Sequence, residues 1–123
     1  MASRLHNEVK DVLKDLYPLC PIEEEKVIRV GNRNLRIDLF VSDPFRIAVE
    51  CQGRQHDEFV PFFHKSKHDF HNSKMRDSAK EAWCFDHYIP LIYVYEHEDI
   101  NRELIKRKIE ESERALDEYY QSE

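Results

Sequence analysis

Hydrophobic and polar positions alternate along this chain in two different periods, which together predict seven elements. Apolar residues recur at helical spacing over 5–16, behind Ser3 as a helix N-cap and ahead of Pro18. Strands are predicted over 26–30, 34–41, 45–51 and 90–95, where Val, Ile, Leu and Phe are concentrated. Helices are predicted over 68–87 and from Asp99 to about 120. The order is α-β-β-β-α-β-α, which predicts an α/β fold.

The second and third strands are predicted to form an antiparallel hairpin. The break between them is Ser42-Asp43-Pro44, and a proline interrupts strand pairing. If the strands pair symmetrically about Pro44, then Asp38 lies opposite Glu50, because each is six residues away. Directly opposed residues share one face of a sheet, with their Cβ atoms about 5 Å apart.

Two carboxylates at that separation repel each other unless a positive charge lies between them. A divalent cation with oxygen ligands is the usual solution in proteins. Gln52 follows Glu50 by two residues and therefore points to the same face, and Gly53 then allows the backbone to turn away. This pattern predicts a metal-dependent phosphodiesterase site.

These residues also carry a family resemblance. The run 47–56, IAVECQGRQH, preceded by Asp38 on the neighbouring strand, resembles the PD-(D/E)XK nuclease superfamily. It is most similar to small stand-alone members related to very-short-patch repair endonucleases and to compact phage and bacterial homing-type nucleases. The segments 76–84 and 89–94 resemble the helix and last strand of the same families, so the likeness covers about residues 3–95. Ile37 replaces the proline of the name, and Gln52 replaces the lysine.

The resemblance implies one restriction-endonuclease-like domain over 1–123, with an αβββαβ core, a mixed four-stranded sheet and an extra C-terminal helix over about 99–121. It implies a Mg²⁺-dependent DNA endonuclease, with Mn²⁺ able to substitute, that leaves 5′-phosphate ends. Asp38, Glu50 and the carbonyl of Cys51 would hold the metal, and Glu8 on the first helix could join them through water. His56 would lie beside the metal. One site cuts one strand, so a double-strand cut would require a homodimer or two binding events.

Gln52 can donate and accept hydrogen bonds but carries no charge. The missing cation could come from Lys74 or Lys80, which occupy different faces of the helix 68–87. Lys80 forms the family-like pair Asp77-x-x-Lys80, although an ordinary surface ion pair between these two residues is an equal alternative.

The charge of the chain is unevenly distributed. The net charge is −6, which by itself disfavours a nucleic-acid partner. Residues 26–36 nevertheless contain four bases and no acid, residues 64–80 contain five bases against two acids, and residues 96–123 contain ten acids against five bases. A basic half could bind DNA locally, and an ordinary solvated surface is the alternative. The predicted DNA-binding residues are Arg33, Arg36, Arg54, Lys67, Lys74 and Arg76.

Three irregularly spaced cysteines and the absence of any long apolar run predict a cytoplasmic protein without a membrane span. Two other functions stay open. The first is a nuclease-fold DNA-binding or assembly module that lost catalysis together with its lysine. The second is a zinc-stabilised interaction module, for which the candidate ligands are His64, His68, His71, Cys84 and His87.

Overall fold

The computed structural model describes residues 3–52 and 67–121, and within the second range it describes side chains from residue 77 onward. The described residues form three helices and a four-stranded sheet in the predicted order. The elements are α1 (Arg4–Leu16), β1 (Ile22–Val30), β2 (Arg33–Val41), β3 (Ile47–Gln52), α2 (Lys67–Asp86), β4 (Leu91–Tyr95) and α3 (Arg102–Gln121).

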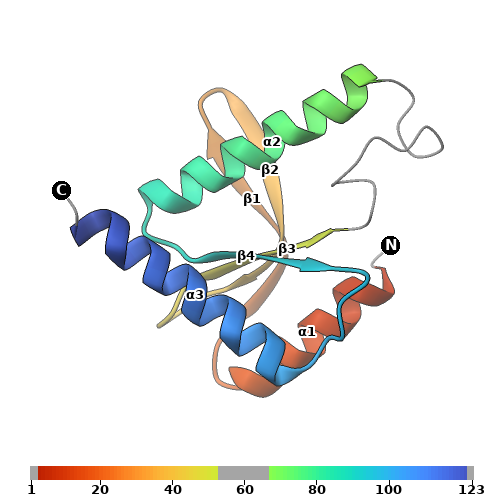
Figure 1. Cartoon of the computed structure of the whole chain (residues 1–123), viewed down its shortest axis with the longest axis vertical. Helices are drawn as coiled ribbons and strands as arrows, with labels where there is room; N and C mark the ends of the chain where they lie inside the picture. Colours follow the sequence, from red (N-terminus) through yellow and green to blue (C-terminus); the bar gives the residue numbers. More distant parts are fainter. Residues whose placement is uncertain (1–2, 53–66, 122–123) are drawn as a thin grey trace.

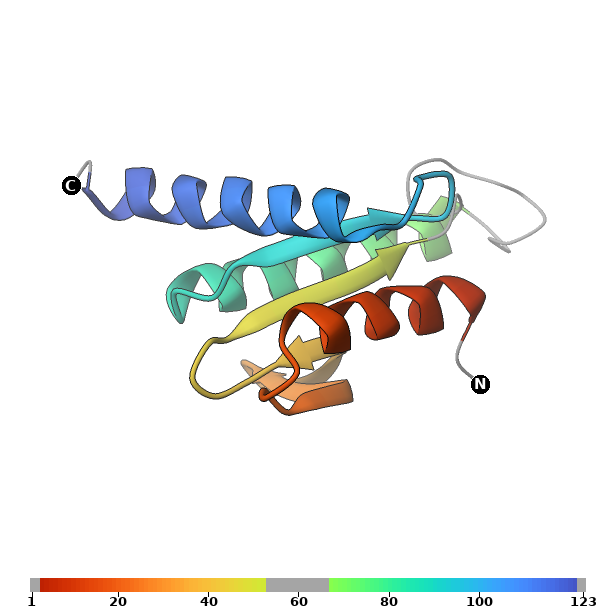
Figure 2. The same ribbon diagram turned by 90° about the horizontal axis from the view of Figure 1, so that it is seen from below.

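The sheet is mixed and lies between two helical layers. Its strand order is β1-β2-β3-β4, with antiparallel pairing up to β3 and parallel pairing between β3 and β4. Helix α2 covers one face, and α1 and α3 cover the other (Figure 1). Viewed from the side of α1 and α3, the sheet lies behind these two helices and α2 lies behind the sheet (Figure 2). The predicted α/β class and mixed four-stranded sheet are therefore confirmed.

Each face of the sheet has its own hydrophobic core. On the side of α1 and α3, Val9 and Leu13 of α1 pack with Val49 of β3 and Ile105 of α3. On the side of α2, Cys84 packs with core residues from three strands and the loop after α2: Ile28, Leu35, Ile37, Phe40, Ala48 and Ile89. Because side chains alternate along β3, Ala48 points to the α2 side and so, by the same period, do Glu50 and Gln52.

Capping side chains explain where two of the helices begin. The Ser3 hydroxyl accepts a hydrogen bond from the His6 amide at 3.1 Å, which caps α1 as predicted. Asn101 caps α3 in the same way through the Leu104 amide at 2.9 Å, so this helix begins at Arg102 rather than at Asp99. Strand β1 begins at Ile22, four residues earlier than predicted.

The free edge of β4 is covered by α3. The Ser112 hydroxyl accepts a hydrogen bond from the Leu91 amide and donates one to the Leu91 carbonyl, both at 3.1 Å. The Lys108 ammonium donates to the Tyr93 carbonyl at 2.8 Å. These side chains satisfy main-chain groups that would otherwise face outward from an edge strand.

No helix within residues 3–52 and 67–121 is long and apolar enough to cross a membrane.

Candidate functional site

Asp38 and Glu50 lie opposite each other, as the symmetry about Pro44 predicted. The pairs Leu39↔Val49, Phe40↔Ala48 and Val41↔Ile47 all centre on residue 44, and the same register places Asp38 opposite Glu50. Glu50 Oε2 accepts a hydrogen bond from the Asp38 amide at 2.8 Å, and Asp38 Oδ2 accepts one from the Cys51 amide at 2.8 Å. Each carboxylate therefore binds the main chain of the opposite strand, where the regular β2–β3 pairing stops.

The backbone is irregular at this level of the sheet. Glu25 of β1 lies across from Asp38 with a φ of +51°, and the β1–β2 register omits this one pair. A positive φ is uncommon for a residue other than glycine. Before Asp38 in the chain, Leu35 and Ile37 pack on the α2 side of the sheet. After it, Leu39 and Val41 pack on the side of α1 and α3. Asp38 thus lies where β2 changes the face that it buries.

Lys80 of α2 contacts the carboxylate pair from the helix that covers this face of the sheet. Its Nζ atom lies 2.7 Å from Glu50 Oε1, and the exposed fractions of the two side chains are 15% and 5%. Of the two lysines considered as the missing cation, Lys80 is the one whose side chain the structure describes, and it reaches the carboxylate pair. The structure therefore brings Lys80 to the Asp38–Glu50 pair. The alternative considered for this lysine was an ordinary surface ion pair with Asp77.

The electrostatics of the pair are dominated by burial. Loss of solvent raises the pKa of Glu50 above its usual value, and the neighbouring Asp38 charge raises it further. Lys80 and the Asp38 amide act in the opposite direction without cancelling these effects. Burial is therefore the main reason that Glu50 holds a proton more tightly than a solvent-exposed glutamate does.

Two other ionisable groups near the pair, the Cys51 thiol and the Tyr93 hydroxyl, have raised pKa values. Burial, followed by the charges of Asp38 and Glu50, raises the pKa of Cys51 to about 12, so its thiol does not ionise near neutrality. Tyr93 is the Cα partner of Glu50 in the parallel β3–β4 register. Its hydroxyl donates a hydrogen bond to Glu81 Oε1 at 2.5 Å. Burial and this hydrogen bond raise the pKa of Tyr93. The Glu81–Tyr93 contact, which the sequence pattern did not indicate, links α2 to β4 one residue from Lys80.

Gln52 lies on the same face as Glu50, as predicted from the strand period. It is 4% exposed, and its Cα partner on β4 is Tyr95. Its carbonyl accepts a hydrogen bond from the Glu96 amide at 3.2 Å, which fixes the end of β3. A buried amide in this position could orient a water molecule or a phosphate oxygen but could not supply charge.

Glu8 does not join the carboxylate pair in this structure. It is exposed on α1 and forms an ion pair with Arg4 at 2.9 Å. His6 is the polar residue that α1 buries, and its Nε2 atom lies 2.9 Å from Glu24 Oε1. The sequence could not distinguish the two because both lie beside the apolar stripe of the helix.

The predicted DNA-binding residues are placed only in part. Arg33 and Arg36 are exposed on β2, and Arg36 lies 3.7 Å from Glu25. Arg54 and the predicted catalytic His56 lie outside the described residues. Lys67, Lys74 and Arg76 belong to α2, but their side chains lie outside the described part of the chain.

The zinc hypothesis gains no support from the two candidate ligands whose side chains are described. Cys84 is buried in the core beside α2, and burial raises its pKa to about 12. His87 stacks on Trp83 with ring centroids 4.3 Å apart. His64 lies outside the described residues, as do the side chains of His68 and His71. Among the described residues, no group of three or more His, Cys, Asp or Glu side chains is arranged to hold a metal ion.

No family model matches this chain. Three curated viral proteins are similar to part of it, and all three bear the name uncharacterized protein. Protein 307L of Invertebrate iridescent virus 6 is 44% identical over 64 residues, which is 52% of this chain and 32% of the relative. Protein 033L of Invertebrate iridescent virus 3 is 35% identical over 65 residues, covering 53% of this chain and 33% of the relative.

Protein 094L of Frog virus 3 (isolate Goorha) is 41% identical over 76 residues, covering 60% of this chain and 48% of the relative. The chain therefore spans between about a third and half the length of these relatives. A solved structure titled "Crystal structure of SSO0001" aligns with 88% of this chain and 55% of its own, at 18% identity and a TM-score of 0.35. A score at this level does not define a shared fold.

Proposed function

We infer that this protein is a metal-dependent DNA endonuclease of the PD-(D/E)XK type. The observation that carries the proposal is the pair formed by half-buried Asp38 and buried Glu50, with the Lys80 ammonium against Glu50. The resemblance to the PD-(D/E)XK superfamily, which suggested the site, is also the basis for proposing a nuclease-like αβββαβ core.

The donor set fits a hard divalent cation. Each carboxylate uses one oxygen to accept a main-chain N–H, which fixes its orientation. The second oxygen of Asp38 could bind a cation, and the second oxygen of Glu50, which the Lys80 ammonium contacts at 2.7 Å, could be shared between that ammonium and a cation. The pair presents only oxygen donors, together with the carbonyl of Cys51, and this set suits Mg²⁺ or Mn²⁺. Burial and then the Asp38 charge raise the pKa of Glu50, and a cation bound between the two carboxylates would offset the second effect.

Asp38 and Glu50 would hold the metal, which when bound would acidify a water molecule and offset charge on the phosphate. Lys80 would hold its ammonium group beside Glu50, where it can donate hydrogen bonds to a phosphate oxygen. Gln52 would orient the attacking water or the phosphate through its amide. This assignment supplies from α2 the cation that the family usually carries at the position of Gln52.

Plasmid nicking in Mg²⁺, in Mn²⁺ and in EDTA tests the activity. Glu50→Gln and Asp38→Asn preserve an oxygen acceptor for the opposing amide but remove the charge. Each should lower metal-dependent nicking by about 10³-fold, the scale of one lost electrostatic contact in a transition state. Glu8→Gln, on the exposed face of α1, should cut like the wild type. Wild-type rates in either charge-removing variant would refute the site.

A second test concerns the lysine. Lys80→Met should reduce nicking by about 10²-fold or more, while Lys80→Arg should retain part of the activity because it preserves the positive charge. Lys108 is the matched control, because it is also ion-paired, at 2.9 Å from Glu98, but lies on α3. If Lys108→Met lowers nicking as much as Lys80→Met does, Lys80 has no specific role in the reaction.

The alternative is a nuclease-fold DNA-binding or assembly module without catalysis. The replacement of the family lysine by Gln52 favours this alternative. Calorimetry separates the two functions. An active enzyme should bind Mn²⁺ and gain thermal stability from it. No Mn²⁺ heat at millimolar concentration, together with no nicking of supercoiled, nicked or single-stranded DNA, would establish the module.

A further inference from the structure

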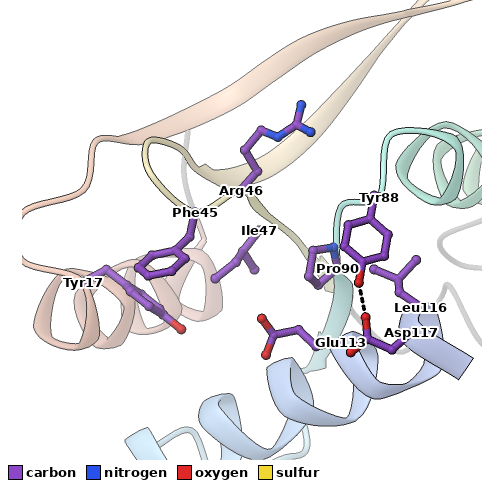
Figure 3. Close-up of a pocket in the computed structure, with 9 residues that line it drawn as sticks. All are labelled: Tyr17, Phe45, Arg46, Ile47, Tyr88, Pro90, Glu113, Leu116 and Asp117. Atoms are coloured by element: carbon purple, nitrogen blue, oxygen red, sulfur yellow. Dashed lines mark hydrogen bonds between the residues drawn. The ribbon is translucent and has the colours of Figure 1, made fainter. Parts of the chain in front are cut away.

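A second candidate site lies on the opposite side of the sheet from the carboxylate pair. A cavity of about 480 Å³ opens between the end of α1, the start of β3, the loop after α2 and the second half of α3. Its floor contains Ile47 and Pro90 (Figure 3). This volume falls within the range of sites that receive a small group or a side chain.

Aromatic rings flank the cavity on both sides. Tyr17 and Phe45 lie together on one side with ring centroids 6.2 Å apart, and Tyr88 lies on the other (Figure 3). Phe45 is 57% exposed and Tyr88 is 53% exposed. Tyr88 has a φ of +57°, and its hydroxyl donates a hydrogen bond to Asp117. The Tyr88 ring is therefore held at the rim by both its backbone and its tip.

The charge presented to the cavity is negative. Glu113 and Asp117 are one turn apart on α3, and the Glu113 carboxylate projects into the space between Tyr17 and Pro90 (Figure 3). Arg46 also lines the cavity, but its side chain points away, and its guanidinium donates to the His87 carbonyl at 3.0 Å. Aromatic faces and carboxylates around an apolar floor are complementary to a cation on an apolar stem.

The aromatic surface continues beyond the cavity. Tyr120 contacts Tyr88 edge-on with ring centroids 5.3 Å apart, and Tyr119 contacts Tyr120 at the same separation. Tyr119 and Tyr120 are 49% and 41% exposed. A small cation could enter the cavity but would leave these rings uncovered, whereas tyrosine-rich surfaces of this kind are typical of protein–protein contacts.

We propose that this face docks a partner protein by receiving an arginine side chain between the Tyr17–Phe45 pair and Tyr88, with its guanidinium on Glu113 and Asp117. The residues that flank the arginine in the partner cover the exposed rings of Tyr119 and Tyr120. The site is independent of the nuclease proposal, because it uses none of the same residues and faces the other side of the sheet.

NMR titration of the full chain tests the site, with N-acetyl-arginine methylamide as the probe. Its amide shifts should be saturable and centred on Tyr88, Glu113 and Asp117, with a Kd on the order of millimolar for so small a ligand. The uncharged citrulline analogue should bind about fivefold more weakly, as should arginine to the Glu113→Gln/Asp117→Asn variant. The amide introduced at position 117 would still accept a hydrogen bond from the Tyr88 hydroxyl, and Glu118→Gln on the same turn is the matched control.

A capped peptide, Ala-Leu-Arg-Leu-Ala, should bind at least about tenfold more tightly than capped arginine, because its leucines can cover the aromatic rim. Equal binding of the peptide and of capped arginine would refute docking of a polypeptide. Equal binding of the citrulline analogue, or equal loss in Glu118→Gln, would refute recognition of the cation. Spermidine binding without arginine binding would assign the cavity to a small polyamine, and tighter binding of dAMP would assign it to a nucleotide; both results would overturn the proposal.

Discussion

Glu50 is a carboxylate whose ionisation works against the native fold. A glutamate in the unfolded chain titrates near 4.5, and burial raises this pKa in the native protein. Between these two pKa values the native state binds more protons than the unfolded state does. The free energy of unfolding contributed by Glu50 therefore falls as the pH rises through that window, and it is level on either side.

Replacing Glu50 by glutamine should remove this contribution. Urea denaturation of the wild type and of Glu50→Gln, repeated at intervals upward from about pH 4.5, should show the wild type losing stability relative to the variant as the pH rises. The expected loss is about 1.4 kcal/mol for every tenfold difference in proton affinity between the native and unfolded states.

Val49→Ala provides the control for that series. Val49 is fully buried, so truncating it should lower the free energy of unfolding by about 2 kcal/mol. Because no charge changes, its effect should be the same at every pH. A Glu50→Gln profile parallel to that of the wild type across the whole series would contradict the assigned pKa direction.

At the scale of elements, the two-residue period of the strands and the turn at Pro44 were the sequence features that best predicted the arrangement of the sheet. Pairing symmetric about Pro44 predicted the opposition of Asp38 and Glu50, because register in a short hairpin follows from its turn. The early start of β1 was missed because Glu23, Glu24 and Glu25 have neither apolar alternation nor strand propensity. Glu23 and Glu24 join the strand through main-chain pairing with β2, which a hydropathy pattern does not report.

The rotation of the helices was the least predictable feature. Neither the spacing of Lys74 and Lys80 nor the position of Glu8 indicates how far each helix turns about its axis when it packs on the sheet. That rotation depends on the shapes of both packed surfaces. As a result, the strand residues of the candidate site could be proposed as a pair from sequence, whereas its helical residues could only be offered as alternatives.

The contact between α3 and the edge of β4 depends strongly on one hydroxyl. Ser112→Ala removes both hydrogen bonds to Leu91, at a cost of about 1–2 kcal/mol, and the higher helix propensity of alanine returns about 0.5 kcal/mol. Thermal denaturation should therefore show a clear decrease in Tm. Glu110→Ala, at an exposed position of the same helix, should leave Tm close to that of the wild type. Equal Tm values for the two variants would show that the edge contacts contribute nothing.

For the whole molecule, charge and layering make the same prediction about where DNA would bind. Helix α3 lies on one side of the sheet and α2 lies on the other (Figure 1). The carboxylate pair faces the α2 side, because Glu50 contacts Lys80 of α2. The tip of the β1–β2 hairpin, with its exposed arginines, extends beside α2 (Figure 1). A duplex that reaches the carboxylate pair would therefore meet the basic hairpin before α3, in which six acids stand against five bases.

Reversing charge on that hairpin should weaken DNA binding. The double variant Arg33→Glu/Arg36→Glu should bind duplex DNA more weakly and with a flatter salt dependence, because each lost phosphate contact reduces the log–log slope by about 0.9. Fluorescence anisotropy over a salt series measures both effects. Lys106→Glu/Arg107→Glu on α3 is the control and should change little. Loss of binding in the α3 variant alone would place DNA on the other side of the sheet.

Both outer edges of the sheet are unsuited to joining another sheet. Three consecutive glutamates occupy β1, and side chains of α3 already occupy the main-chain groups of β4. A second strand would have to bury like charges at one edge or displace a packed helix at the other. Folded copies should therefore stay dispersed even at high concentration. Amyloid-like growth should begin only where α3 has first detached, so a Ser112→Ala preparation should fibrillise earlier than the wild type under mild heating.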